Sequence, residues 1–150
     1  MRNAASMADC CAPLWSGTSH IKLVDPHFDA STRRFKRPFV EFVRRVRAGT
    51  TVDVFRGDQI GAEFYVSAIQ RALEELRRTD IVLRLFVRQQ TAMHNRFILS
   101  SAGGISFQIG LDEDATGERP EDIVTVLQSD VWLKEWETYT DEDCLARLTL

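Results

Sequence analysis

The chain lacks the features of several protein classes. It has no apolar run near the ~18 residues that a membrane-spanning helix requires, and residues 1–17 contain no continuous apolar segment like that of a signal peptide. Its three cysteines, Cys10, Cys11 and Cys144, cannot form a conventional disulfide framework, and no Cys-x-x-Cys or Cys/His metal-ligand spacing occurs. We therefore expect a soluble, cytoplasmic protein with reduced cysteines.

An excess of positive charge is also missing. The sequence has 19 Lys and Arg against 22 Asp and Glu, for a net charge of -3, which gives no general attraction to nucleic acid. The basic clusters 33–37 and 44–47 are either solvated helix faces or local contacts for phosphate or anionic lipid. With 150 residues, 44% hydrophobic and 27% charged, the chain is typical of one globular domain without internal repeats.

The hydrophobic pattern predicts alternating strands and helices. Residues 1–19 have no sustained period and are expected to form a poorly ordered leader, followed by one domain over residues 20–150. The predicted strands are 21–24, 51–55, 81–87, 94–100 and 105–111; the predicted helices are one ending at Gly49, one over 62–78, and short ones over 123–128 and 131–139. This order predicts an α/β/α sandwich with helices on both faces of a mixed, mainly parallel sheet of about five strands.

One pair of polar residues suggests a binding site. His94 and Arg96 lie two residues apart on a predicted strand, so both side chains should leave the same face. Matching polar face to polar face on the next strand places Arg96 opposite Gly110 and His94 opposite Asp112. Arginine offers a fork of donors for phosphate, and glycine leaves room for the anion. The alternative is a surface hairpin in which His94 pairs with Asp112 and Arg96 forms an ordinary ion pair.

A second group of polar residues follows the first predicted strand. Asp25, His27 and Asp29 come just after this strand, which ends where Asp25-Pro26 begins. The three residues could suggest a metal site, but Asp-Pro-x-x-Asp is common turn chemistry. We predict no metal and no cofactor.

The order of these motifs resembles that of phospholipase D-like domains. The resemblance covers about residues 20–115 and is carried by Ile21-Lys22-Leu23-Val24-Asp25-Pro26-His27-Phe28, two strand-helix units, His94-Asn95-Arg96-Phe97, a turn and Ile109-Gly110-Leu111-Asp112. The closest variant is the domain at the C-terminus of MIT-domain proteins and its bacterial relatives, whose pattern is Asp-Pro-Tyr, then His-Asp-Arg, then Gly-Leu-Asp. The resemblance implies a phospholipase D-like fold.

The resemblance also implies what the site can do. In active members a histidine attacks phosphorus, and His94 matches it, with Arg96 in place of the family's lysine. Ser101 stands where the family has Asp, Leu111 replaces a hydroxyl residue after Gly110, and Asn95 replaces the acid of His-Asp-Arg. Because only one motif copy exists, catalysis would need a homodimer that brings two His94 residues together.

We therefore expect a degenerate recognition module, dimeric in solution, that binds a phosphate-bearing ligand, either an anionic lipid or nucleic acid, or a partner protein. Its binding residues are expected to be Arg96, Gly110, Asp112, Asp25 and His27. One alternative is a homodimeric, metal-independent phosphodiesterase or nuclease with His94 as nucleophile and Arg96 as the second catalytic residue. The other is a structural adaptor domain.

Overall fold

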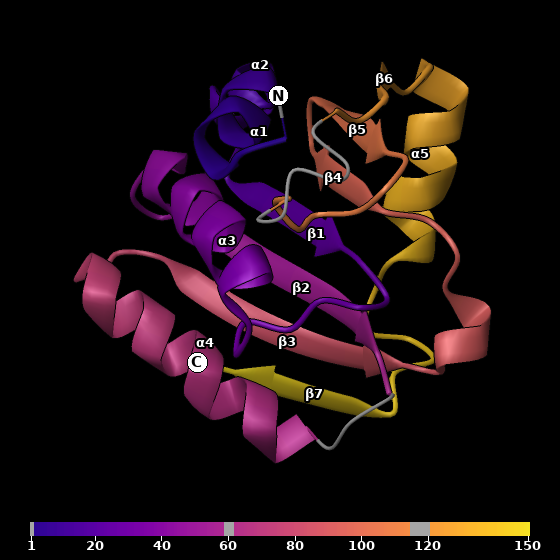
Figure 1. Ribbon diagram of the computed structural model, residues 1–150. Coiled ribbons are helices and arrows are strands. Elements are labelled where there is room, and N and C mark those ends of the chain that lie inside the picture. Colours follow the sequence, from indigo (N-terminus) through magenta and orange to yellow (C-terminus); the bar gives the residue numbers. More distant parts are fainter. Residues whose placement is uncertain (1, 59–61, 115–120) are drawn as a thin grey trace.

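A computed structural model describes residues 2–58, 62–114 and 121–150 (Figure 1). The α-helices are α1 (Ala4–Cys10), α2 (Ala12–Trp15), α3 (Arg33–Arg45), α4 (Ala62–Leu76) and α5 (Ser129–Thr138), with a short 3-10 helix η1 (Gln90–Ala92). The strands are β1 (His20–Val24), β2 (Thr51–Gly57), β3 (Val82–Arg88), β4 (Phe97–Ser100), β5 (Gly103–Phe107), β6 (Val124–Val126) and β7 (Ala146–Thr149).

These strands form one seven-stranded sheet in the order β6-β5-β4-β1-β2-β3-β7. β1, β2 and β3 are parallel neighbours, connected through α3 and α4, and the other four pairings are antiparallel. The prediction of an α/β fold with a mixed sheet is confirmed. The prediction of a mainly parallel sheet of about five strands is wrong, because two short antiparallel strands, β6 and β7, extend the two edges, and β6 falls where a helix was predicted.

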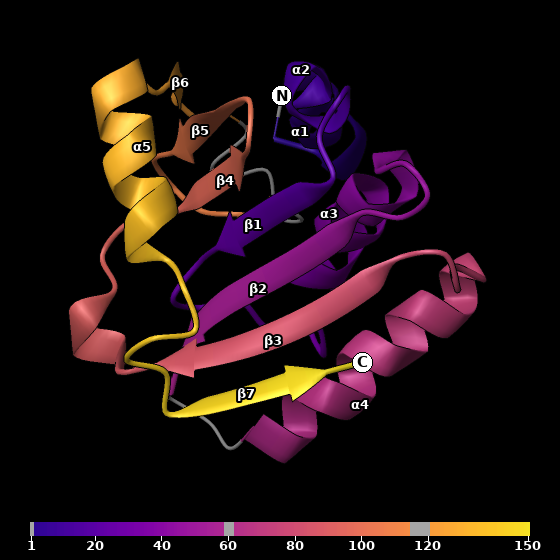
Figure 2. The same cartoon turned by 180° about the vertical axis from the view of Figure 1, so that it is seen from behind.

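Apolar cores lie on both faces of the sheet. On one face α3 and α4 pack on the parallel strands (Figure 1). The core there includes Phe39, Phe42 and Ile69 from the helices and Val52 and Leu83 from the strands. Helix α5 covers the opposite face beside β4 and β5 (Figure 2). The smaller core under it contains the following residues: Val24, Phe55, Phe86, Met93, Phe97, Leu99 and Tyr139, with Trp132 and Trp136 packed against them.

The N-terminal segment is part of the larger core, so the prediction of a poorly ordered leader over residues 1–19 is wrong for the described residues 2–19. α1 and α2 bury Met7, Ala8, Leu14 and Trp15. The Trp15 ring lies 5.9 Å from that of Phe42, and its Nε1 donates to the Ala8 carbonyl at 3.1 Å. Each of the two helices is too short for a sustained hydrophobic period, which is why the sequence pattern did not reveal them.

Polar side chains occupy the sheet surface under α5. Asp53 on β2 is buried, and its Oδ1 accepts a hydrogen bond from Arg84 Nε at 2.6 Å. Its Oδ2 accepts one from Arg84 Nη2 at 2.8 Å and also lies 2.6 Å from His20 Nε2. Burial alone would raise the pKa of Asp53, but the hydrogen bonds to His20 and Arg84 outweigh it and lower the pKa. His20 is therefore part of a polar cluster with Asp53 and Arg84.

Two cations hold the C-terminal end of α5 against the sheet. Lys22 Nζ donates to the carbonyls of Trp136 at 2.7 Å and Tyr139 at 2.6 Å, and lies over the Trp136 ring. Arg88 Nη2 donates to the carbonyls of Thr138 and Thr140. The last carbonyls of a helix lack partners within it and carry partial negative charge, so these cations stabilise a helix none of whose residues is fully buried.

Candidate functional site

The candidate site lies where the end of β1 meets the start of β4. These strands are antiparallel, and their register pairs Val24 with Phe97, so Asp25 and Arg96 emerge side by side at the same edge. From β1 the chain continues to β2 on one side of β1 in the sheet, and it later returns to place β4 on the other side of β1. Ligands of open α/β sheets bind at such a reversal of strand order.

Asp25 fixes the loop that closes this edge. Its carboxylate is buried, with Oδ1 accepting the His27 amide at 2.8 Å and Oδ2 accepting the Leu111 amide at 2.8 Å. Burial raises the pKa of Asp25, against the lowering effect of these hydrogen bonds and of nearby Arg96. Gly110 has φ +148°, and a Cβ there would lie 3.1 Å from Asp25 Oδ2, so this close approach requires glycine.

Beside this loop is a polar pocket of about 320 Å³. The lining residues are His94, Asn95, Arg96, Ser106, Phe107, Gln108, Ile123 and Thr125. His94 is exposed and Arg96 is half-buried. The Nε of Arg96 is buried and has no hydrogen-bond partner within the described ranges. None of the lining residues in the described ranges carries a carboxylate, so this part of the pocket has the composition of an anion site.

The predicted strand register is wrong. β4 begins at Phe97, so His94 and Arg96 lie in the loop after η1 rather than on a strand. The hairpin pairs Ser100 with Gly103, which leaves a turn of only Ser101 and Ala102, and the tighter turn shifts every cross-strand pair. Arg96 consequently lies opposite Phe107, whose amide donates to its carbonyl at 3.0 Å, and not opposite Gly110.

Asp112 is not paired with His94, as the sequence had suggested. Arg2 Nη2 donates to Asp112 Oδ1 at 2.6 Å and to its carbonyl oxygen at 2.8 Å, and Arg34 Nε lies 3.6 Å from Oδ2. The carboxylate therefore faces the N-terminal segment and α3, because Arg2 is held there by a segment that the sequence predicted to be disordered.

The remaining predicted residues have separate locations. His27 is exposed and does not line the pocket, although its amide binds Asp25. Thr125 lines the pocket and was missed, because residues 123–128 were predicted to be helical; the alternation Val124-Thr125-Val126 was the available signal for a strand. In the described ranges no three His, Cys, Asp or Glu side chains are grouped to hold a metal ion.

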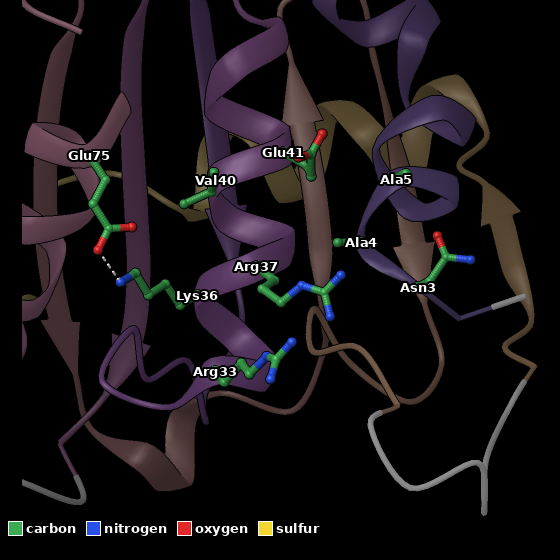
Figure 3. Close-up of a pocket in the computed structure, with 9 residues that line it drawn as sticks. All are labelled: Asn3, Ala4, Ala5, Arg33, Lys36, Arg37, Val40, Glu41 and Glu75. Carbon is green, nitrogen blue, oxygen red and sulfur yellow. Dashed lines mark hydrogen bonds and ion pairs between the residues drawn. The ribbon is translucent and has the colours of Figure 1, made fainter. Parts of the chain in front are cut away.

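A second hollow, of about 380 Å³, lies between α1, α3 and α4 (Figure 3). It carries Arg33, Lys36 and Arg37, but Glu41 and Glu75 line it too. Lys36 Nζ lies 2.5 Å from Glu75, and Arg37 is paired with Glu113 at 3.0 Å. This mixed charge makes the hollow a weaker candidate for an anion than the pocket at Arg96.

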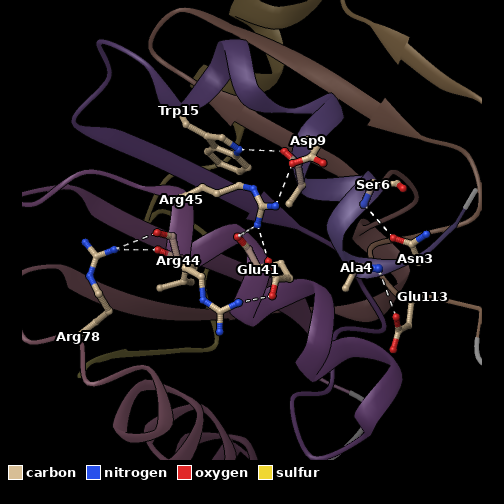
Figure 4. Close-up of polar contacts among 12 residues, drawn as sticks. Asn3, Ala4, Ser6, Asp9, Trp15, Glu41, Arg44, Arg45, Arg78 and Glu113 are labelled. Atoms are coloured by element: carbon tan, nitrogen blue, oxygen red, sulfur yellow. Dashed lines mark hydrogen bonds and ion pairs between the residues drawn. The ribbon is translucent and has the colours of Figure 1, made fainter.

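The second basic cluster of α3 is neutralised in the same way. Arg44 and Arg45 both pair with Glu41, and Arg45 also reaches Asp9 of α1 at 2.9 Å (Figure 4). The pair of Arg45 and Asp9 joins α1 to α3. The exposed side of α3 is thus largely a network of ion pairs. Within the part of the chain that the structure describes, no helix is long and apolar enough to cross a membrane.

Comparison with known proteins gives no family. No family model and no curated protein matches the sequence. A solved structure with some similarity is that of TrmBL2, described as an archaeal chromatin protein with a novel mode of DNA binding. The two are 13% identical with a TM-score of 0.44, over 92% of this chain and 48% of the other, so this chain spans about half the length of TrmBL2. A similarity this distant carries no argument about function.

Proposed function

We propose that this protein is a recognition module that binds a phosphate-bearing ligand in the pocket formed by His94, Asn95 and Arg96. The observation that carries the proposal is the composition of this pocket. It combines an arginine whose buried Nε has no partner among the described residues, a histidine and four neutral polar side chains, and no carboxylate among the lining residues that the structure describes. Phosphate oxygens satisfy such donors, and the planar guanidinium matches their geometry.

Asp25 supports binding indirectly. It does not line the pocket, but its carboxylate accepts hydrogen bonds from the amides of His27 and Leu111. It also lies close enough to Arg96 for the arginine to act on the pKa of Asp25. Buried carboxylates that orient a neighbouring ligand-binding group act in this way. The resemblance to phospholipase D-like domains also favours a role for Asp25 and Arg96.

The alternative activity is hydrolysis of a phosphodiester with His94 as nucleophile. The described lining contains a single histidine and no acid to protonate the leaving group. If the protein hydrolyses bis-p-nitrophenyl phosphate in the presence of a chelator, and His94→Ala abolishes this activity, the protein is an enzyme and not a binding module.

Arg96→Gln tests the proposal by calorimetric titration with pyrophosphate. We expect the affinity to fall about tenfold or more, equivalent to roughly 1.4 kcal/mol, because the variant loses the charge and the donor fork. Arg71→Gln is the matched control, since Arg71 is exposed on α4 and absent from this pocket. Equal losses in both variants, or no binding by the unmodified protein, would contradict the proposal.

The source of the phosphate is tested with two further probes. Vesicles that contain a phosphoinositide present a lipid headgroup, and a single-stranded oligonucleotide presents a nucleic-acid backbone. Binding of one probe, lost in Arg96→Gln, identifies the source.

A further inference from the structure

Strand β6 exposes an apolar sheet edge. It pairs with β5 and is the last strand on this side of the sheet among the described residues. Ile123 is 66% and Val126 is 75% exposed, and residues 123–129 contain no charge. Edge strands of monomeric proteins are commonly protected by lysine, proline or a bulge. The segment Ile-Val-Thr-Val-Leu-Gln-Ser has neither lysine nor proline.

The hydrogen bonds to β5 define which backbone groups face outward. The Leu127 amide donates to Gly104 at 2.9 Å, and the Gln108 amide donates to the Ile123 carbonyl at 3.2 Å. Residues 123, 125 and 127 therefore direct their peptide groups toward β5. In an antiparallel ladder the alternate residues point the other way, so Val124 and Val126 direct their N–H and C=O groups away from the sheet.

We propose that a second copy of this chain pairs antiparallel with β6 about a two-fold axis at Thr125. In this register Val124 of each copy exchanges two hydrogen bonds with Val126 of the other, and the four bonds use the outward-facing groups just described. Val124 packs on Val126 of the second copy on one face, and Ile123 meets its Leu127 on the other. Both cross-strand contacts are apolar.

Apolar pairing selects this register over its neighbours. With the axis at Thr125, Val124 lies opposite Val126 and Ile123 lies opposite Leu127. With the axis at Val126, Val124 would lie opposite Gln128 and Leu127 opposite Thr125. With the axis at Val124, Val126 would lie opposite Asp122 and Ile123 opposite Thr125. The strand is therefore self-complementary in one arrangement, and this favours a second copy over an unrelated partner.

The interface also reaches the candidate pocket. Ile123 and Thr125 line that pocket, and Thr125 shares a sheet face with its strand partner Ser106. In the dimer the Thr125 and Leu127 side chains of the second copy extend the pocket wall, and the two pockets open on the same face of one continuous sheet. Two anion sites side by side suit a ligand with repeated phosphates. The pairing itself does not depend on anion binding.

Sedimentation equilibrium of the full chain tests the interface. We expect twice the 17.1 kDa chain mass at high micromolar concentration, since so small an interface gives weak association. Val126→Lys is expected to give the mass of one chain with an unchanged circular dichroism spectrum. The matched control is Leu148→Lys, a 38% exposed leucine on the other edge strand β7, which should leave the dimer intact.

Oxidative cross-linking of Thr125→Cys supplies a second measurement. Thr125 at the axis forms a non-hydrogen-bonded pair with Cα atoms about 4.5 Å apart, within the range of a disulfide. Cys10 is exposed, so the variants are made in a Cys10→Ser background. There we expect Thr125→Cys to form a disulfide-linked dimer that neither Cys10→Ser alone nor Leu148→Cys forms under the same conditions.

Three results would overturn the interface: one-chain mass at every concentration, a Val126→Lys dimer, or failure of Thr125→Cys to cross-link. A one-chain mass with pyrophosphate binding intact would overturn the interface and leave the proposed anion pocket standing.

Discussion

Replacing Trp15 with alanine is expected to lower the free energy of unfolding by about 3–5 kcal/mol. Trp15 is 6% exposed, packs on Phe42 and donates its Nε1 hydrogen bond to Ala8. The variant leaves a cavity between the N-terminal helices and α3 and removes one of two donors to the Ala8 carbonyl, which also accepts the Cys11 amide at 3.2 Å. Urea unfolding followed by far-ultraviolet circular dichroism measures the change.

The control for this variant is Leu145→Ala. Leu145 is 57% exposed, so its truncation should change stability by less than about 0.5 kcal/mol. If Trp15→Ala also falls in that range, the N-terminal segment is not part of the core.

Asp53→Ala is expected to cost about 3 kcal/mol. The substitution leaves Arg84 and His20 without their carboxylate. It also removes the negative charge that opposes the lowering of the Lys22 pKa by burial. This loss in the free energy of unfolding is at the low end for a broken buried ion pair, because the Arg84 side chain is 38% exposed. Asp53→Asn preserves the shape and should lose less.

The same carboxylate predicts how stability depends on pH. The folded-state pKa of Asp53 is below its unfolded value, so its contribution is complete above the unfolded pKa of about 3.9 and is lost as the pH falls through the folded pKa. Unfolding free energies measured from pH 6 downward should therefore decrease less in Asp53→Asn than in the unmodified protein. Parallel curves for the two proteins would contradict this assignment.

Much of the central fold was predictable from the sequence. Strand β3 lies in the nearly continuous apolar run 81–87, and the stripe Phe39, Phe42, Val43 marks α3, because these elements are buried on the faces that their patterns indicate. The register of the β4–β5 hairpin was not predictable in the same way. It depends on the length of the turn, and a turn of two residues instead of a longer one changed every pair.

The candidate site was predictable only in part. The structure brings Asp25, Arg96 and Gly110 to one edge, as motif order suggested, but Asp112 is bound by Arg2. The cluster of His20, Asp53 and Arg84 could not be found from the sequence, because it depends on the relative register of strands separated by whole helices. Contacts of this kind are fixed by tertiary packing and leave no local pattern.

A crystal structure of the protein soaked with tungstate would show whether anions bind at Arg96 and not at the other basic surfaces, because tungsten can be located by its anomalous scattering. We expect tungstate in the pocket lined by His94, Asn95 and Arg96, within hydrogen-bonding distance of the Arg96 guanidinium. Tungstate only in the hollow beside Arg33 and Arg37, or in neither place, would contradict this expectation.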